Sequence, residues 1–241
     1  MKKVIIIPAR YQSSRFPGKP LMKILNKELI LWAVEISNGV VGKKNTYVAT
    51  DSLLIKNFLK NNKINYVMTS KNCRTGTDRV AEAAKKIKSD IYINLQGDEP
   101  LIKKSDIQKI IKQKIKNYNN VICGYSSLMK NENPKNINIP KILFNKNKKL
   151  IYASRLPIPG KKKRTDKCLF FKQVCVYAFN SNELKKFKNC KKKTYYEAQE
   201  DIELLRFFDL DIDIKMQKMS STSMAVDVKS DIKKVEKYLN G

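Results

Sequence analysis

Residues 3–21 read KVIIIPARYQSSRFPGKPL and predict how the fold begins. The apolar run 3–7 is typical of a strand that is buried on both faces of a parallel sheet. The polar stretch 8–20, which contains three prolines, predicts a loop at the carboxyl end of that strand. Ligands bind at this end of the strands in open α/β sheets. The sequence therefore predicts a ligand-binding loop directly after the first strand.

The composition of this loop suits a polyphosphate. It places three cations within ten residues, together with hydroxyls and a glycine: Arg10, Arg15, Lys19, Ser13, Ser14 and Gly18. Such a loop can wrap a triphosphate, although an ordinary basic surface loop is the alternative. A Walker A loop is excluded, because Ser13 stands at its first glycine position and Pro20 at its magnesium-ligating Ser/Thr position.

Apolar runs alternate with amphipathic stretches over the first half of the chain. The pattern predicts strands at 46–49, 66–68 and 91–95 and helices at 28–38, 52–61, 77–88 and 105–116. This alternation indicates an α/β fold in which helices flank a mostly parallel sheet.

The alternation breaks after about residue 127. Residues 129–170 contain Asn-Lys tracts and four prolines, which indicate an excursion from the sheet with mobile loops. The later pattern predicts a returning strand at 173–179, helices at 181–188, 198–208 and 230–239, and a strand at 212–217. We expect one domain with three parts: a nucleotide-binding half (1–128), an excursion (129–180) and a return to the sheet (181–241).

Composition excludes several classes of protein. The chain has 241 residues and a net charge of +28, and its cations are 43 lysines against only 7 arginines. Scattered lysines without an aromatic-rich basic motif indicate a solvated surface, so we expect no specific nucleic-acid binding; a basic nucleic-acid-binding protein is the non-enzyme alternative. No apolar run reaches the roughly 18 residues of a membrane span. The absence of histidine excludes His-based triads.

Cysteine usage indicates the compartment. The five cysteines are scattered, without a CxxC pair that could bind zinc or form a redox motif. An odd number of scattered cysteines, in a chain that shows no signal-peptide pattern, predicts reduced thiols and a cytoplasmic location.

A carboxylate motif follows the strand 91–95. Residues 96–100 read QGDEP, and Gly97 lets the chain turn so that Asp98 projects from the carboxyl edge of the sheet. Asp98 would then face the phosphates held by the first loop. Because like charges repel, this placement implies a cation, and Mg²⁺ suits carboxylate and phosphate oxygens.

Four blocks in the same order resemble the sugar-acid cytidylyltransferases, above all the 3-deoxy-manno-octulosonate (Kdo) cytidylyltransferase family. They are PARYQSSRFPGKPL (8–21), VATD (48–51), MTS with TGTDR (68–70 and 75–79) and NLQGDEPL (94–101). The resemblance covers essentially the whole chain. It implies a Rossmann-like nucleotidyltransferase fold and transfer of CMP from CTP to the anomeric hydroxyl of a 2-keto sugar acid, with release of pyrophosphate. A nucleotidyltransferase for another base or sugar is the alternative within the class.

The resemblance also implies site residues. In the family the last block supplies a second metal-binding aspartate, which falls on Asp227 of AVDV (225–228); a turn residue is the alternative for Asp227. Asp98 and Asp227 would bind Mg²⁺, and Arg10 and Lys19 would neutralise the phosphates. The remaining nucleotide-binding positions are Pro8, Ala9, Ser13, Ser14, Arg15, Thr75, Gly76 and Arg79, of which the last three would hold the cytidine end.

The sugar end carries one departure from the family. Arg155 of SRLPIP (154–159) is the candidate partner of the sugar carboxylate, and Gln96, Tyr177 and Glu197 map to sugar-contacting positions. Gln173 stands where the family usually has histidine, so a related acid, such as an amino-Kdo or a nonulosonate, is the alternative to Kdo. Glu200, Glu203 and Arg206 are expected to form helix salt bridges instead. The excursion 129–180 is expected to pair subunits in a homodimer.

Overall fold

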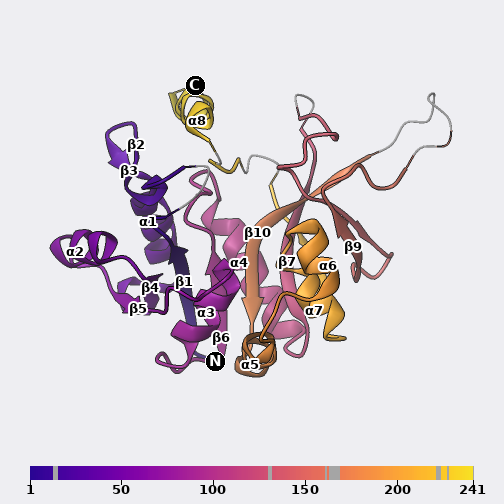
Figure 1. Cartoon of the computed structure of the whole chain (residues 1–241), viewed down its shortest axis with the longest axis horizontal. Coiled ribbons are helices and arrows are strands. Elements are labelled where there is room, and N and C mark those ends of the chain that lie inside the picture. The colour runs from indigo at the N-terminus through magenta and orange to yellow at the C-terminus, as the bar shows by residue number, and fades with distance from the viewer. Residues whose placement is uncertain are drawn as a thin grey trace.

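The computed structural model describes residues 1–12, 16–129, 132–160, 162, 169–220, 224–226 and 228–240. Among them runs a nine-stranded sheet, in which seven strands follow the order β11-β7-β10-β6-β1-β4-β5 (Figure 1). β1 (Lys3–Ala9) is central and parallel to both β4 (Thr46–Thr50) and β6 (Ile91–Leu95), and β5 (Tyr66–Met68) extends the parallel part. The predicted strands of the first half are confirmed.

The other half of the sheet is mixed. β10 (Phe171–Phe179) runs antiparallel to β6 and to β7 (Val121–Ser127), and β11 (Ile214–Lys218) is parallel to β7. The structure therefore has the mixed, mostly parallel sheet that was predicted. Our sequence analysis missed β7, whose VICGYSS sequence lacks the long apolar run of the other buried strands.

Helices cover both faces of the sheet. α1 (Leu29–Val41), α2 (Leu53–Asn61) and α4 (Lys104–Lys116) pack on one face, where the odd-numbered isoleucines of β1 point. α3 (Gly76–Ala84), α5 (Ser181–Asn189) and α7 (Leu205–Asp209) pack on the other, against Val4 and Ile6. Alternate residues of β1 thus enter two separate cores, as expected for a strand that is buried on both faces.

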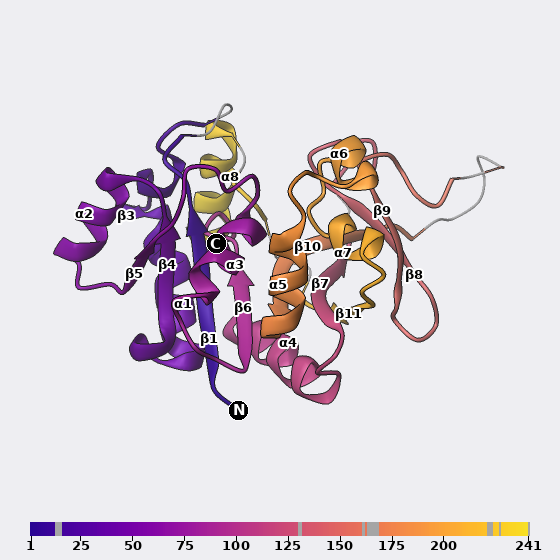
Figure 2. The same ribbon diagram turned by 60° about the horizontal axis from the view of Figure 1, so that its bottom comes forward.

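The excursion joins the sheet, which corrects part of our prediction. Its sequence contains two unpredicted strands, β8 (Lys141–Phe144) and β9 (Leu150–Ser154), and β8 pairs with β10. The Asn-Lys tract between them forms the tight connection of a hairpin, with Lys148 in the left-handed region at φ 62°. Figure 2 shows this hairpin on the side of β10 away from β1.

The region predicted as one helix at 198–208 forms two. α6 (Tyr195–Glu200) ends at Asp201, whose φ of 50° is left-handed, and α7 starts four residues later. Residues 201–204 therefore form a turn between the two helices. This break in the helix places Glu203 in the pocket described below.

The remaining elements close the carboxyl edge of the sheet. A small hairpin, β2 (Lys23–Ile24) and β3 (Lys27–Glu28), follows the first loop, and α8 (Lys229–Asn240) packs on it near the start of α1. In Figure 1 both lie at the same end of the molecule as the carboxyl end of β1. No helix among the described residues is long and apolar enough to span a membrane.

Candidate active site

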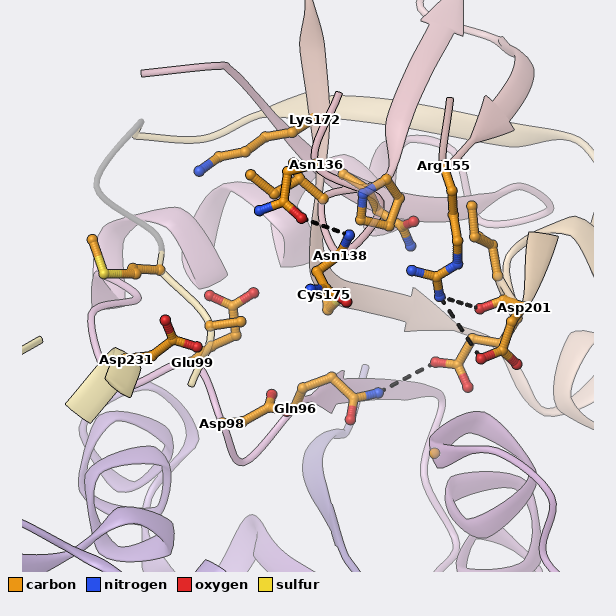
Figure 3. A pocket seen from close by; sticks show the side chains of 18 of the residues that line it. Gln96, Asp98, Glu99, Asn136, Asn138, Arg155, Lys172, Cys175, Asp201 and Asp231 are labelled. Carbon is orange, nitrogen blue, oxygen red and sulfur yellow. Dashed lines mark hydrogen bonds and ion pairs between the residues drawn. The ribbon is translucent and has the colours of Figure 1, made fainter. Parts of the chain in front are cut away.

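A pocket of about 750 Å³ opens at the carboxyl ends of β1 and β6. Because β10 is antiparallel to β6 and pairs Val176 with Leu95, the first residues of β10 extend beyond the end of β6 and form a second wall. Figure 3 shows Gln96 and Asp98 on one side of the pocket and Lys172, Asn136 and Arg155 on the other. The parallel half and the excursion therefore enclose one site between them.

Asp98 lies just beyond the carboxyl end of β6, as predicted. Its Oδ2 accepts a hydrogen bond from Lys19 Nζ at 2.5 Å, and Lys19 also donates to the carbonyl oxygen of Val226 at 3.0 Å. The Val226 amide donates to the Asp98 carbonyl at 2.9 Å. These three contacts tie the segment before α8 to the end of β6. Asp227 itself lies outside the described residues, but its neighbour Val226 is held beside Asp98.

The start of α3 forms the wall next to Gln96. Thr75 and Asp78 cap this helix reciprocally, each accepting a hydrogen bond from the other's amide at 3.1 Å. Gly76 permits a close approach, because a Cβ atom there would lie 2.6 Å from Gln96 Nε2. Thr75, Gly76 and Gln96 all line the pocket, as predicted. The capping box therefore fixes the helix end on which the nucleotide-binding prediction rests.

Glu203 is a pocket residue that our sequence analysis assigned to a helix salt bridge. It lies in the turn between α6 and α7, where its carboxylate accepts from the Thr77 amide at 2.9 Å and from Gln96 Nε2 at 3.2 Å. Burial raises the pKa of Glu203. Only the break between α6 and α7 places Glu203 in the pocket, and the acidic residues at 200–203 made this break hard to predict.

The first loop is described in part. Arg10 lines the pocket, and its Nη2 is buried with no hydrogen-bond partner among the described residues. Burial lowers the pKa of Arg10, and the positive charge of Arg79 lowers it further. Pro8 and Ala9 are buried strand residues paired with β4, so they support the loop from below and do not line the pocket. Ser13, Ser14 and Arg15 lie outside the described residues.

Arg79 does not reach the pocket, which corrects its predicted contact with cytidine. Its side chain is completely buried, with Nη1 donating to Thr69 Oγ1 at 2.6 Å and Nη2 to Asp51 Oδ2 at 2.9 Å. Arg79 therefore links α3 to the ends of β4 and β5. Because it lies beneath Arg10, it acts on the site by positioning and through its charge.

Two residues that were predicted to contact the sugar form hydrogen bonds with other parts of the protein. Arg155 lines the pocket, but its guanidinium donates to the carbonyl oxygens of Ile137, Glu200 and Asp201. Glu197 also borders the pocket, yet both its oxygens accept from the buried Arg206, at 2.6 and 2.7 Å. The predicted salt-bridge role of Arg206 is thus confirmed, and Glu197 is its partner. We therefore replace direct contact by Glu197 with a supporting role.

Three alternate residues of β10 face the pocket: Gln173, Cys175 and Tyr177. Gln173 Nε2 donates to Tyr177 Oη at 2.7 Å, while Gln173 Oε1 is buried without a partner among the described residues. The pairing of β10 with β7 shifts register between Val174 and Tyr177, a bulge that re-aims side chains at the end of a strand. Gln173 therefore offers a free acceptor to a ligand, as its predicted place in the sugar end requires.

The oxygen donors at the pocket fit a magnesium ion. Asp98 presents a quarter-exposed carboxylate, and only one of its oxygens contacts Lys19. No cluster of three or more metal-ligating side chains occurs in the described part of the chain. Mg²⁺ commonly takes one or two carboxylates and fills its remaining positions with substrate phosphates and water. Asp98 can therefore supply one carboxylate ligand to such an ion.

The sheet order and the pocket together define an α/β nucleotidyltransferase, with cations after β1 and an aspartate after β6. The family model described as cytidylyltransferase matches residues 4–214, and the chain belongs to this family.

The more particular resemblance is confirmed by curated relatives. The 3-deoxy-manno-octulosonate cytidylyltransferase of Thermodesulfovibrio yellowstonii is 35% identical over 254 residues, which cover 100% of this chain and 99% of the relative. The 8-amino-3,8-dideoxy-manno-octulosonate cytidylyltransferase of Shewanella sp. is 34% identical and is covered equally, 99% of each chain.

A solved structure agrees over the full length. The structure of CMP:2-keto-3-deoxy-manno-octonic acid synthetase complexed with CTP superposes with a TM-score of 0.90 at 31% identity, covering 100% of this chain and 99% of the other. The predicted nucleotidyltransferase fold is confirmed by this match.

Proposed function

We propose that this protein transfers CMP from CTP to the anomeric hydroxyl of a 2-keto-3-deoxy sugar acid, Kdo or a close relative, and releases pyrophosphate. One observation carries the proposal: one pocket is lined by Arg10 and by Asp98, whose partner is Lys19, and also by the polar side chains of Gln96, Glu203 and Gln173. The charged groups suit phosphates and form the proposed nucleotide end, and the polar side chains suit the hydroxyls of a sugar and form the proposed sugar end. The relatives act on Kdo or its 8-amino analogue, by their names.

The nucleotide end neutralises charge and positions the α-phosphate. Arg10 would donate to a phosphate from Nη2, which has no partner among the described residues, and Lys19, which bonds to Asp98, would neutralise phosphate charge beside it. Asp98 and Asp227 are the proposed ligands of Mg²⁺, which when bound would supply electrostatic stabilisation of the phosphates and the leaving group. Transfer then needs no covalent enzyme intermediate, in keeping with a chain without histidine.

The sugar end orients the attacking hydroxyl. Gln96 is held on Glu203, and Gln173 is held on Tyr177, so each amide keeps one fixed face and offers the other to the substrate. Fixed polar groups of this kind hold a reacting group in line at little entropic cost. The Arg155 guanidinium holds the walls of this end together, and its charge still attracts the acid.

A panel of nucleotides and sugars tests the proposal. Pyrophosphate release should be measured with each of the four nucleoside triphosphates against Kdo, 8-amino-Kdo and a nonulosonate, with and without a chelator. We expect release only with CTP and an octulosonate, and only when Mg²⁺ is present. Equal rates with UTP, or full activity in chelator, would contradict the proposal.

Gln173 should tune the choice of sugar. Gln173→His replaces a neutral amide by a ring that can also contact Tyr177, so Kdo turnover should stay within about tenfold of wild type, about 1.4 kcal/mol. If 8-amino-Kdo is the natural substrate, wild type should prefer it, and Gln173→His should shift the preference toward Kdo. The ratio of kcat/KM for the two sugars measures this, with the exposed Gln108→His as the matched control. An unchanged ratio together with a poor rate for both sugars would remove Gln173 from the sugar end.

We also infer that the protein works as a homodimer in the cytoplasm. Phe144 and Leu150 of the excursion are covered within the chain by Tyr125, Phe171 and the main core, so these two side chains need no second subunit to bury them. Large apolar side chains nevertheless remain exposed on the excursion and beside it: Ile137, Ile151, Leu156, Leu169 and Tyr195. Exposed apolar side chains of this kind mark interaction surfaces, and a two-fold contact between subunits would bury them on both copies. The described cysteines are free, as a reducing cytoplasm requires.

Light scattering checks the subunit number. We expect about twice the 27.9 kDa of one chain at micromolar concentration, and replacement of Ile151 by lysine should lower that mass. A mass near that of one chain for the wild type would contradict the dimer.

A further inference from the structure

Arg74 lines the pocket but has no part in the proposed phosphate, metal or sugar contacts. It lies directly before Thr75, at the start of α3, and its side chain is 29% exposed. Its Nη2 donates to the Cys190 carbonyl at 2.5 Å and lies 3.6 Å from Asp78 Oδ1. Its Nη1 is buried and has no hydrogen-bond partner among the described residues. The guanidinium is thus held from one side and leaves a donor unused on the other.

An unused buried donor requires a physical explanation. Buried polar groups almost always have partners, because leaving one unsatisfied forfeits the hydrogen bonds that water would make. Lysine is the common cation of this chain, so the planar fork of arginine at position 74 has a geometric use. Nη2 uses one arm of the fork on the protein. The free arm is available to a ligand in the pocket that Arg74 lines.

The charges around Arg74 indicate what kind of group it binds. Asp78 and Glu197 each carry one negative charge, and both bond to the positive Arg206. Arg74, beside Asp78, carries a second positive charge. This cluster is therefore neutral as a whole. A phosphate or carboxylate would bring uncompensated negative charge to it, whereas a neutral acceptor would not. Arg10 differs, because it lies beside the positive Arg79 and so suits an anion.

A pyrimidine base offers such an acceptor. The ring edge of cytosine presents the O2 and N3 acceptors side by side, whereas uracil presents a donor at N3. Arg74 adjoins Thr75 and Gly76, the wall that the nucleotide is expected to meet. We propose that Arg74 Nη1 donates to the O2/N3 edge of the cytosine ring and that Arg74 selects CTP over UTP. This inference rests on the proposed cytidylyl transfer.

Substitution of Arg74 by methionine tests this inference. Arg74→Met keeps the length and apolar stem but removes every donor. We expect the KM for CTP to rise by about tenfold or more, the ratio of kcat/KM for CTP over UTP to fall by at least about tenfold, and the KM for the sugar acid to stay within about twofold. Arg74→Lys keeps the charge and one donor and should retain part of the discrimination. Lys71→Met, on an exposed position of the same segment, is the matched control and should change none of these values.

A binding measurement that needs no turnover completes the test. Calorimetric titration with CMP and with ribose 5-phosphate separates the base from the phosphate: Arg74→Met should weaken CMP binding and leave ribose 5-phosphate binding unchanged. Equal weakening of both would make Arg74 a phosphate ligand, and a raised KM for the sugar acid alone would make it the carboxylate partner; either result overturns the inference, as does an unchanged CTP/UTP ratio. If Arg74→Met does not fold, Arg74→Lys and Arg74→Gln carry the same comparison. Failure of the proposed function is distinct, because the wild type would then release no pyrophosphate with any sugar acid.

Discussion

Replacement of Asp98 by asparagine should lower kcat by at least about two orders of magnitude, about 2.7 kcal/mol of transition-state stabilisation. Asparagine has the size of aspartate but no charge, so the variant loses the charge of a proposed Mg²⁺ ligand. It also leaves the Lys19 ammonium, now 2.5 Å from Asp98 Oδ2, without its counter-charge. Both effects act on the same phosphates and fall on the chemical step. Pyrophosphate release at saturating CTP and sugar acid measures the loss.

A second variant separates these two effects. If Asp98 binds the ion, Asp98→Asn should raise the Mg²⁺ concentration for half-maximal rate by about tenfold or more, whereas Lys19→Met should lower kcat without that shift. The control is Asp213→Asn, which makes the same change in an aspartate paired to Lys149 at the same distance, 2.5 Å, but on the open surface. Asp213→Asn should leave kcat unchanged. Normal turnover in Asp98→Asn would refute the metal assignment.

The parallel half of the fold could be predicted from sequence, because its elements carry strong local signals. Residues 91–95 and 66–68 match β6 and β5 to the residue, and each is a short, mostly apolar run bounded by polar turns. The mixed half was harder. β8 and β9 lie in an Asn-Lys-rich segment, where they pair with each other, and β8 also pairs with β10, a long-range contact that no local pattern encodes.

The site was predicted best where a motif and a strand end coincide. Asp98 and Gln96 follow β6 in a QGDEP turn, and the structure places both in the pocket. Sequence reasoning failed for Arg79 and Glu203 in opposite ways. Arg79 was expected in the pocket and is buried beneath it, whereas Glu203 was expected in a salt bridge and lines it. Which of two charged residues on a helix or turn faces a cavity depends on how α3 packs against α5 and against the turn that carries Glu203, which the sequence does not state.

Of all the proposed variants, Arg206→Met should show the largest decrease in the free energy of unfolding. The Arg206 side chain is fully buried, and it donates to Glu197 Oε1 and Oε2 at 2.6 and 2.7 Å and to Asp78 Oδ1 at 2.7 Å. The guanidinium also lies 3.8 Å from the centre of the Phe187 ring. Arg206→Met keeps most of the volume but leaves the buried Glu197 without its cation, and it leaves Asp78 with only the more distant Arg74, at 3.6 Å. Such a change typically costs about 3–5 kcal/mol, a large share of the 5–15 kcal/mol that stabilises a domain.

Urea unfolding of the variants measures this cost. Lys149→Met breaks the exposed pair with Asp213 and is the matched control, which should unfold close to wild type. The triple variant Arg206→Met, Asp78→Asn, Glu197→Gln removes Arg206 together with the charges of its two carboxylate partners and should regain part of the loss. If Arg206→Met unfolded like Lys149→Met, the cluster would contribute no more than a surface pair.

The pH dependence identifies the charge as the cause. Burial alone would raise the pKa of Asp78, but the hydrogen bonds and charge of Arg206 outweigh it and lower the pKa below its ordinary value. A lowered pKa in the folded state gives stability that is present above the unfolded pKa of about 3.9 and is lost as pH falls through the folded pKa. The gap in unfolding free energy between wild type and Arg206→Met should therefore be full at pH 7 and shrink below about pH 4. Because Asp78 caps α3 and Glu197 borders the pocket, the same protonation should loosen the wall formed by Thr75 and Gly76, so the affinity for CMP should fall in the same acidic range. A gap that stayed constant down to pH 2 would mean that Arg206 stabilises the fold by packing on Phe187 and not by its charge.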